Sequence, residues 1–202
     1  MDVAAAIIAG GPARRLGGVA KPFLMLGTRT VADRQLAVLR PIFARVLAIV
    51  AEPADAAAWG TLGVQAIADR VQGAGPLAGL AAALAAAGGQ AVVCVAGDMP
   101  FLSASLLLAL RDQAPGAEAL APRRSGRAEP LCARYARRLL PEVEARLAAG
   151  RLALHALLEE SSGARWLDDG RLTELGVGDE AFFNLNGPDD LARAEVLARG
   201  RG

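Results

Sequence analysis

Short apolar runs alternate with helix-like segments in the first half of this sequence, and no other feature restricts the fold as strongly. The apolar runs cover residues 3–9, 45–50, 64–67 and 91–96, and helical spacing covers 31–39, 53–62, 77–87 and 103–112. Nearly continuous apolar strands indicate a parallel sheet with both faces covered, because a strand with one solvent-exposed face alternates apolar and polar residues. The 202 residues suffice for one domain with a substantial core and would be cramped as two. The sequence therefore predicts an α/β fold, a single-domain three-layer αβα sandwich around a mostly parallel, twisted sheet.

The second half of the chain is less regular. We expect strands at 120–121, 130–133 and 164–167, helices at 136–149 and 152–159, and a final helix over 188–199. In open parallel sheets, ligands bind beyond the carboxyl ends of the strands. That rule puts the segment after residue 9 and the turn at 97–100 on the same edge of the sheet.

The first apolar run leads into a glycine-rich segment that carries cations. Gly10 and Gly11 are followed by Arg15 and Lys21. Main-chain N–H groups of a glycine loop, together with positive side chains, can surround a polyphosphate. Lys21 is the stronger candidate of the two cations, because an ammonium group is a compact charge that can bridge phosphate oxygens. The segment predicts a nucleoside triphosphate loop, with a purely structural glycine turn as the alternative. The dinucleotide pattern G-x-G-x-x-G is absent, and the Walker pattern fails because Pro22, rather than serine or threonine, follows Lys21.

Polar side chains follow two of the expected strands. Asp98 comes directly after 91–96, where a carboxylate facing a phosphate loop could hold Mg²⁺ together with substrate phosphates and water. The alternative role of Asp98 is an N-terminal cap for the helix after Pro100. Asp69, after 64–67, has the same choice of roles, with a surface turn favoured. Asn184 and Asn186 can offer carbonyl oxygens to a metal or a substrate, or form an Asx-turn before the last helix.

Composition excludes several classes of function. The 22 lysine and arginine residues nearly balance 21 aspartate and glutamate residues, so no overall field favours nucleic acid or an anionic membrane. Two isolated cysteines suggest reduced, buried thiols in a cytoplasmic protein. The one histidine, His155, lies within a helical segment, so neither a nucleophilic triad nor a zinc site can be assembled. The charge-free stretch 73–97 is interrupted by Gly88 and Gly89, which favours a helix and a buried strand over a membrane span.

Several motifs identify a family resemblance. The segment IAGGPARRLGGVAKP, at 8–22, resembles the signature of the molybdenum cofactor guanylyltransferases. Further matches follow in order over nearly the whole chain: PLAGL at 76–80, GDMPF at 97–101, EPLCARY at 129–135 and NLNGPDDL at 184–191. The resemblance implies a Rossmann-like nucleotidyltransferase fold, with GTP bound by about 1–101 and molybdopterin bound by about 102–202.

The resemblance also implies an activity: transfer of GMP from Mg·GTP to the terminal phosphate of Mo-molybdopterin, with release of pyrophosphate. Its catalytic candidates are Arg15, Lys21 and Asp98, and Asp98 is also the Mg²⁺ ligand. The implied nucleotide contacts are Ile8, Ala9, Gly10, Gly11, Lys21, Asp69 and Asp98. Asn184 and Asn186 are expected near the metal and the second substrate. For Arg151, binding of the pterin or its phosphate is weighed equally against a solvated arginine at the start of a helix. A monomer is expected, with molybdoenzymes or their chaperones as further partners.

The chain departs from the family pattern at Leu16, where methionine is usual, and in two further places; three other functions stay open. No polar residue occurs at 49–51, where many relatives carry asparagine, and Gly187 stands where threonine is common, which weakens the expected helix cap. The alternatives are the same transfer from CTP, a sugar-1-phosphate nucleotidyltransferase, and a non-catalytic module that binds GTP and hands over the cofactor. Relatives that use CTP resemble L-A-A-G at the first motif, so Gly10 favours GTP.

Overall fold

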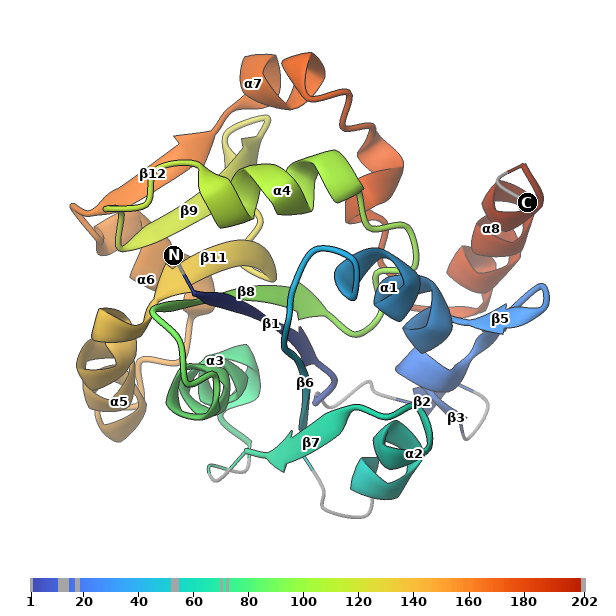
Figure 1. The fold of residues 1–202 in the computed structure, drawn as a ribbon, viewed down its shortest axis with the longest axis horizontal. Helices are drawn as coiled ribbons and strands as arrows, with labels where there is room; N and C mark the ends of the chain where they lie inside the picture. Colours follow the sequence, from blue (N-terminus) through green and yellow to red (C-terminus); the bar gives the residue numbers. More distant parts are fainter. Residues whose placement is uncertain are drawn as a thin grey trace.

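The computed structural model describes residues 2–10, 15–16, 19–51, 55–69, 71 and 73–200. It shows one central sheet with helices on both faces (Figure 1). The strands are β1 (Val3–Ile8), β2 (Arg15–Leu16), β3 (Val19–Ala20), β4 (Met25–Leu26), β5 (Arg29–Thr30), β6 (Val46–Val50), β7 (Gln65–Ala68), β8 (Ala91–Ala96), β9 (Ala119–Arg124), β10 (Arg127–Ala128), β11 (Cys132–Ala136) and β12 (Ala164–Leu167). The helices are α1 (Val31–Leu39), α2 (Ala56–Thr61), α3 (Gly75–Ala86), α4 (Ala104–Asp112), α5 (Leu140–Ala148), α6 (Leu154–Glu160), α7 (Asp169–Glu174) and α8 (Pro188–Arg199), with 3-10 turns η1 (Lys21–Phe23), η3 (Arg137–Leu139) and η4 (Asp179–Phe182).

The sheet is mixed, with a parallel half that confirms the predicted fold class. Its order is β10-β9-β11-β8-β1-β6-β7, and β12 pairs with β9. β1 is parallel to both β6 and β8, and β6 is parallel to β7. β11 is antiparallel to β8 and to β9, because the chain reverses at Ser125 and Gly126. Both of these turn residues have positive φ, as in the tight turns that join antiparallel strands.

Side chains of β1 alternate between two hydrophobic cores, one on each face of the sheet. Val3, Ala5 and Ile7 join the core under α1 and α4, whereas Ala4, Ala6 and Ile8 join the core under α3, α5 and α6. Both sets are buried, which explains why β1 carries no polar position. A Cβ atom at Gly79 of α3 would lie 2.9 Å from Cγ2 of Ile8, so glycine lets this helix lie close to β1.

A third, smaller cluster joins the C-terminal helix to the segment after Lys21. It contains Leu24 and Leu26 from the β4 region, Leu185 before α8, and Ala194 and Ala198 of α8. Figure 1 shows α8 beside β5, near the ends of β1 and β8 rather than their beginnings. The packing therefore brings residues 184–188 to the edge where ligands bind in this class of sheet.

The boundaries differ from the predicted ones where the pattern is short. The predicted strand 130–133 is displaced to Cys132–Ala136, and the predicted helix 136–149 is a 3-10 turn followed by Leu140–Ala148. The hairpins β2–β3 and β4–β5 were not predicted, because two-residue strands carry no detectable period. α7 was also not predicted; it begins at Asp168, whose side chain accepts a hydrogen bond of 2.9 Å from the backbone N–H of Arg171.

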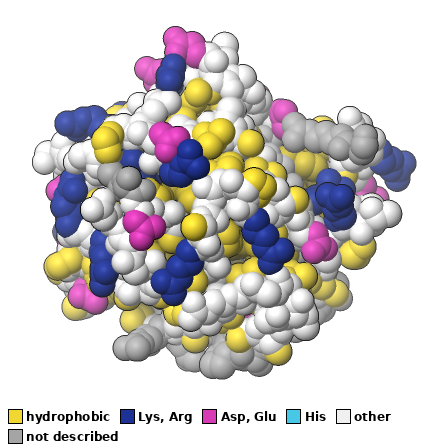
Figure 2. Space-filling model, in the orientation of Figure 1, with side chains coloured by type: hydrophobic (Ala, Val, Ile, Leu, Met, Phe, Trp, Pro, Cys, Tyr) yellow, Lys and Arg dark blue, Asp and Glu magenta, His cyan; other side chains and the backbone are white. Residues whose placement is uncertain are grey.

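No helix in the described part of the chain is long and apolar enough to cross a membrane. The charge-free stretch 73–97 contains α3 and β8, as the sequence predicts. On the face shown in Figure 2, basic and acidic side chains are interspersed with apolar and uncharged ones. This arrangement agrees with the balanced composition.

Candidate active site

Lys21 and Asp98, far apart in the sequence, meet in one ion pair. Nζ of Lys21 donates to Oδ2 of Asp98 at 2.9 Å, and the two side chains are 10% and 20% exposed. Lys21 begins the η1 turn, and Asp98 follows β8 directly. Two of the three predicted catalytic charges therefore lie together at the carboxyl edge of the parallel strands, in a place with little solvent.

Close packing of strand ends determines where the two charges lie. The backbone N–H of Gly97 donates to the carbonyl of Ile8 at 2.9 Å, which joins the end of β8 to the end of β1. A Cβ atom at Gly97 would lie 3.1 Å from Cγ of Pro22 and 3.2 Å from Cα of Ala9. Because Pro22 follows Lys21 and Gly97 precedes Asp98, this contact fixes the separation of the two charges.

Three of the predicted nucleotide contacts lie at the end of β1. Ile8 is buried, and Ala9 and Gly10 are half-buried. A Cβ atom at Gly10 would lie 3.1 Å from Cβ of Ala51, so this position has no room for a side chain. Gly11 lies outside the described residues. Of Arg15 the structure describes the backbone, in β2, and not the side chain, so its catalytic role stays a prediction.

Asn184 and Asn186 flank a direct contact with the Asp98 turn. The backbone N–H of Leu185, between them, donates to the carbonyl of Asp98 at 3.0 Å. Asn184 is half-buried and Asn186 is exposed. Nδ2 of Asn184 donates to the carbonyl of Phe182 at 3.0 Å. The structure therefore brings both asparagines to the neighbourhood of Asp98, as the sequence predicts.

The missing threonine before α8 is compensated by Asp190. Its Oδ2 accepts hydrogen bonds from the backbone N–H groups of Asn186 at 2.9 Å and Gly187 at 3.2 Å. A carboxylate in the first turn of a helix also interacts favourably with the helix dipole. The segment 184–187 is thus held without a side chain at Gly187.

Asp69 lies further from this pair. It follows β7 and is half-buried, and its backbone N–H donates to the carbonyl of Val50 at 2.9 Å. In the strand order, β7 is separated from β8 by β1 and β6, so Asp69 lies three strand spacings from Asp98, about 14 Å. It shares the carboxyl edge of the sheet but does not contact the ion pair.

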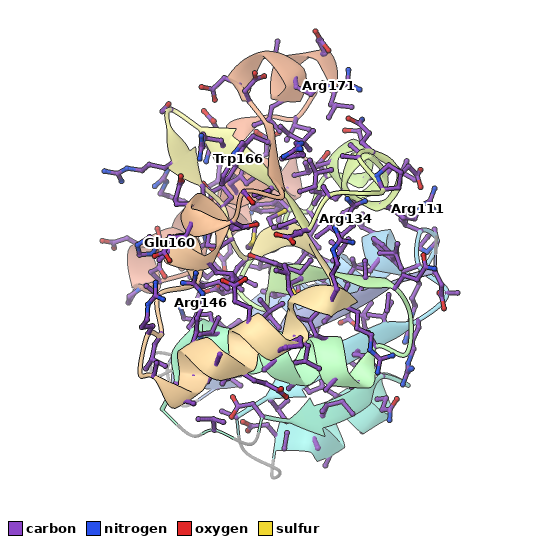
Figure 3. The ribbon with its side chains drawn as sticks, turned by 90° about the vertical axis from the view of Figure 1, so that its left-hand side faces the viewer. Arg111, Arg134, Arg146, Glu160, Trp166 and Arg171 are labelled. Carbon is purple, nitrogen blue, oxygen red and sulfur yellow. The ribbon has the colours of Figure 1, made fainter. Side chains whose placement is uncertain are left out.

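Arg151 forms a contact of its own, apart from the Lys21–Asp98 pair, and its role in binding the second substrate stays a prediction. It is exposed and donates to Oε2 of Glu160 at 2.5 Å. Glu160 also accepts from Arg146 at 2.9 Å, and Figure 3 shows Arg146 and Glu160 side by side. These contacts join the segment before α6, and also α5, to the end of α6, on the side of the sheet where β1 and β8 begin (Figure 1). An exposed position of this kind is compatible with the alternative interpretation, a solvated arginine at a helix start.

The other candidate chemistries find no support in the described residues. No group of three histidine, cysteine, aspartate or glutamate side chains that could hold a metal occurs among them. Cys94 and Cys132 are buried and unbridged, and burial raises the pKa of both thiols. His155 is exposed on α6. Asp98 does not cap α4, because Ser103 does so: its Oγ accepts from the backbone N–H of Leu106 at 3.3 Å.

The motifs alone do not indicate two features of the site. Lys21 is the only lysine in the sequence; every other basic residue counted with it is an arginine. A chain that otherwise uses arginine throughout, yet has one lysine in a glycine-rich loop, carries a compositional signal for a compact charge at that position. The second feature is Gln35 of α1, which is fully buried and bonds to the Asp98 turn. A single glutamine on a helix gives no such signal in a sequence.

Comparisons with known proteins identify the family. A family profile described as "MobA-like NTP transferase domain" matches residues 5–165. A molybdenum cofactor guanylyltransferase from Cereibacter sphaeroides is 37% identical over 197 residues, which covers 96% of this chain and 95% of that protein. A probable molybdenum cofactor guanylyltransferase from Pelotomaculum thermopropionicum is 31% identical over 195 residues, which covers 95% and 91%. The crystal structure of molybdopterin-guanine dinucleotide biosynthesis protein A from Archaeoglobus fulgidus superposes with a TM-score of 0.83 at 28% identity, covering 98% of this chain and 99% of that chain. The chain therefore belongs to the MobA-like NTP transferase family, and it is a nucleotidyltransferase.

Proposed function

We propose that this enzyme transfers GMP from Mg·GTP to the terminal phosphate of Mo-molybdopterin, giving molybdopterin guanine dinucleotide and pyrophosphate. The observation that carries the proposal is the meeting of Lys21 and Asp98, 2.9 Å apart, at the carboxyl edge of β1 and β8. The names of the relatives that match nearly the whole chain support the choice of reaction. We further propose GTP binding by the first half, pterin binding by the second half, and a monomeric, cytoplasmic enzyme.

The residues at the site fit a magnesium ion that arrives with the nucleotide. Asp98 supplies one carboxylate, and the amide oxygens of Asn184 and Asn186 belong to the adjacent segment. Mg²⁺ in proteins takes one or two carboxylates and completes its shell with phosphates and water, so a lone acid beside amide groups is a suitable donor set. When bound, the ion would neutralise charge on the phosphates and on the pyrophosphate that leaves.

The chain's own residues supply charge compensation and alignment. The attacking phosphate is already an anion, so no general base has to remove a proton from it. Lys21 would place its ammonium group on phosphate oxygens as charge develops on the leaving pyrophosphate. Backbone N–H groups near Gly10 would bind the triphosphate, and the low exposure around Lys21 strengthens each of these interactions. His155, exposed on α6, has no part in this reaction.

Release of pyrophosphate from GTP, with and without purified Mo-molybdopterin, tests the proposal. We expect release only when GTP, Mg²⁺ and the pterin are all present, and much slower release with CTP. Lys21→Ala and Asp98→Ala should each lower kcat by roughly 100- to 1,000-fold, the scale for losing one preorganised electrostatic group. Arg171→Ala, which removes an exposed arginine paired with Glu174 on α7, is the matched control and should retain full activity.

Labelling of the single lysine separates binding from turnover. Lys21 carries the only ε-amino group of the chain, so an amine-directed reagent reports on this site once the α-amino group is blocked. Mg·GTP should slow that labelling. Protection without pterin-dependent release of pyrophosphate would favour a non-catalytic GTP-binding module, and turnover with CTP equal to that with GTP would favour the cytidylyl transfer.

A further inference from the structure

The β-turn that carries Asp98 is fixed by backbone hydrogen bonds. The N–H of Met99 donates to the carbonyl of Ala96 at 3.3 Å, which closes the turn. The N–H of Gly97 bonds to the end of β1, and the N–H of Leu185 bonds to the carbonyl of Asp98. The turn is therefore joined to the central strand and to the segment before α8.

One side chain, from a helix on the face of the sheet, completes this network. Nε2 of Gln35 donates to the carbonyl of Ala96 at 2.7 Å and to the carbonyl of Met99 at 3.0 Å. These two carbonyls belong to the first and last residues of the turn. A single amide group of α1 thus bridges the turn from end to end, with Asp98 between the two anchoring points.

Packing alone does not explain why a glutamine occupies position 35. The residue is 0% exposed, and its Oε1 is buried without a hydrogen-bond partner among the described residues. The reverse orientation of the amide would put Oε1 against two carbonyl oxygens, so the turn dictates its orientation. A buried amide group whose oxygen has no hydrogen bond destabilises the fold relative to an apolar side chain of the same size. The compensating gain is the pair of bonds to the turn.

We propose that Gln35 is a positioning residue for nucleotidyl transfer: it holds the turn at 96–99 so that the carboxylate of Asp98 stays opposite Lys21. This inference rests on the proposed function for its kinetic consequences. Gln35 acts through the backbone of the turn, and the geometry that it maintains is the one that Asp98 needs in order to bind the metal–nucleotide complex.

Gln35→Met tests the proposal, because methionine has a similar length and shape and has no donor. We expect the variant to fold, with kcat reduced roughly 10- to 100-fold, as for a small misplacement of a catalytic group. The Mg²⁺ concentration for half-maximal rate should rise, and the amides of Gly97 and Met99 should exchange hydrogen faster. Leu39→Ala is the matched control: it removes a fully buried apolar side chain, one helical turn further along α1, that cannot form a hydrogen bond with the turn. It should lower Tm and leave kcat and the Mg²⁺ requirement unchanged.

Either of two results would overturn the proposal. In the first, Gln35→Met keeps the kcat, the Mg²⁺ requirement and the amide exchange rates of the wild type. In the second, Leu39→Ala loses as much kcat as Gln35→Met. If Gln35→Met fails to fold, Gln35→Glu keeps the volume and can donate one hydrogen bond to the turn when its carboxyl group is protonated. Its kcat relative to wild type must then rise as the pH falls, and a flat ratio refutes the idea. If wild-type enzyme shows no turnover of GTP, the proposed function fails, and hydrogen exchange at the turn still decides whether Gln35 holds it.

Discussion

Gly97→Ala is expected to disturb the Lys21–Asp98 pair by adding one methyl group between two chain segments. The new Cβ atom would lie 3.1 Å from Cγ of Pro22, 3.2 Å from Cα of Ala9 and 3.2 Å from the carbonyl oxygen of Ile8. Contacts between carbon atoms are favourable at about 3.5–4.0 Å, so each neighbour is roughly half an ångström too close. The backbone of β1 is held in the middle of the sheet, and the strain therefore falls on the turns that carry Lys21 and Asp98.

The expected cost is that of overpacking a well-filled interior, about 1–3 kcal/mol of unfolding free energy. For a chain of this size that corresponds to a decrease in Tm of about 2–12 °C. Since a misplacement of about 1 Å can cost 100-fold in rate, a shift of half that size should lower kcat about tenfold.

The measurements are thermal unfolding and pterin-dependent release of pyrophosphate, each compared with Gly116→Ala. A Cβ atom added at Gly116 would meet no other atom within 4 Å, and the φ angle there is not positive, so alanine should be neutral or slightly stabilising. Equal stability and equal kcat in the two variants would refute the argument that contact between Gly97 and Pro22 sets the geometry of the site.

Two single residues and one pair of cysteines lead to further predictions. Lys21→Arg should abolish most turnover. The ammonium group of Lys21 lies 2.9 Å from Asp98 and the lysine side chain is 10% exposed, so the bulkier planar guanidinium does not fit there. A variant with more than about half of the wild-type kcat would contradict this. At Gly60 in α2, no atom lies within 4 Å of the methyl group that alanine would add. Gly60→Ala should therefore raise the unfolding free energy, measured by denaturant titration, by about 0.5–1 kcal/mol. An unchanged or lower unfolding free energy would be inconsistent with this prediction. Cys94 and Cys132 should react slowly with an aromatic disulfide reagent at pH 8 in the native protein and rapidly in guanidinium chloride. Burial shields both thiols and raises the pKa of Cys132 to about 12, so little thiolate forms. Fast labelling of the native protein would disprove the burial argument.

The fold was predictable where a local pattern reports on burial. β1 and β8 are buried on both faces, so their sequences are continuously apolar, and α1 and α4 have clear helical spacing with the caps Thr30 and Ser103. The direction of β11 was not predictable, because it depends on a turn at Ser125 and Gly126 and on pairing with β8 and β9. Nothing within five residues of a strand encodes which neighbour it will pair with.

The site was predictable to the same extent. Asp98 lies just after a recognisable strand, and Lys21 lies at the end of the glycine-rich segment that follows another. Parallel strands end at one edge of a sheet, so the meeting of the two charges could be anticipated. The contact of Arg151 with Glu160 was not predicted, because an arginine before a helix carries no information about the direction of its side chain, and Glu160 is nine residues further along the chain. Gln35 was missed because its role is a pair of bonds to carbonyl groups more than sixty residues away.

The Lys21–Asp98 pair is best understood as a consequence of backbone geometry and not as its cause. An isolated ion pair of this exposure contributes modestly to stability, because loss of hydration offsets much of the attraction. By contrast, the turn that carries Asp98 is hydrogen-bonded to β1, to α1 and to the segment before α8, and it is Gly97 that allows Pro22 to approach. These contacts would remain if either charge exchanged its partner for a phosphate or a cation. A nucleotidyltransferase needs this property, since electrostatic stabilisation accelerates a reaction only when the charged groups are held in advance by something other than the substrate.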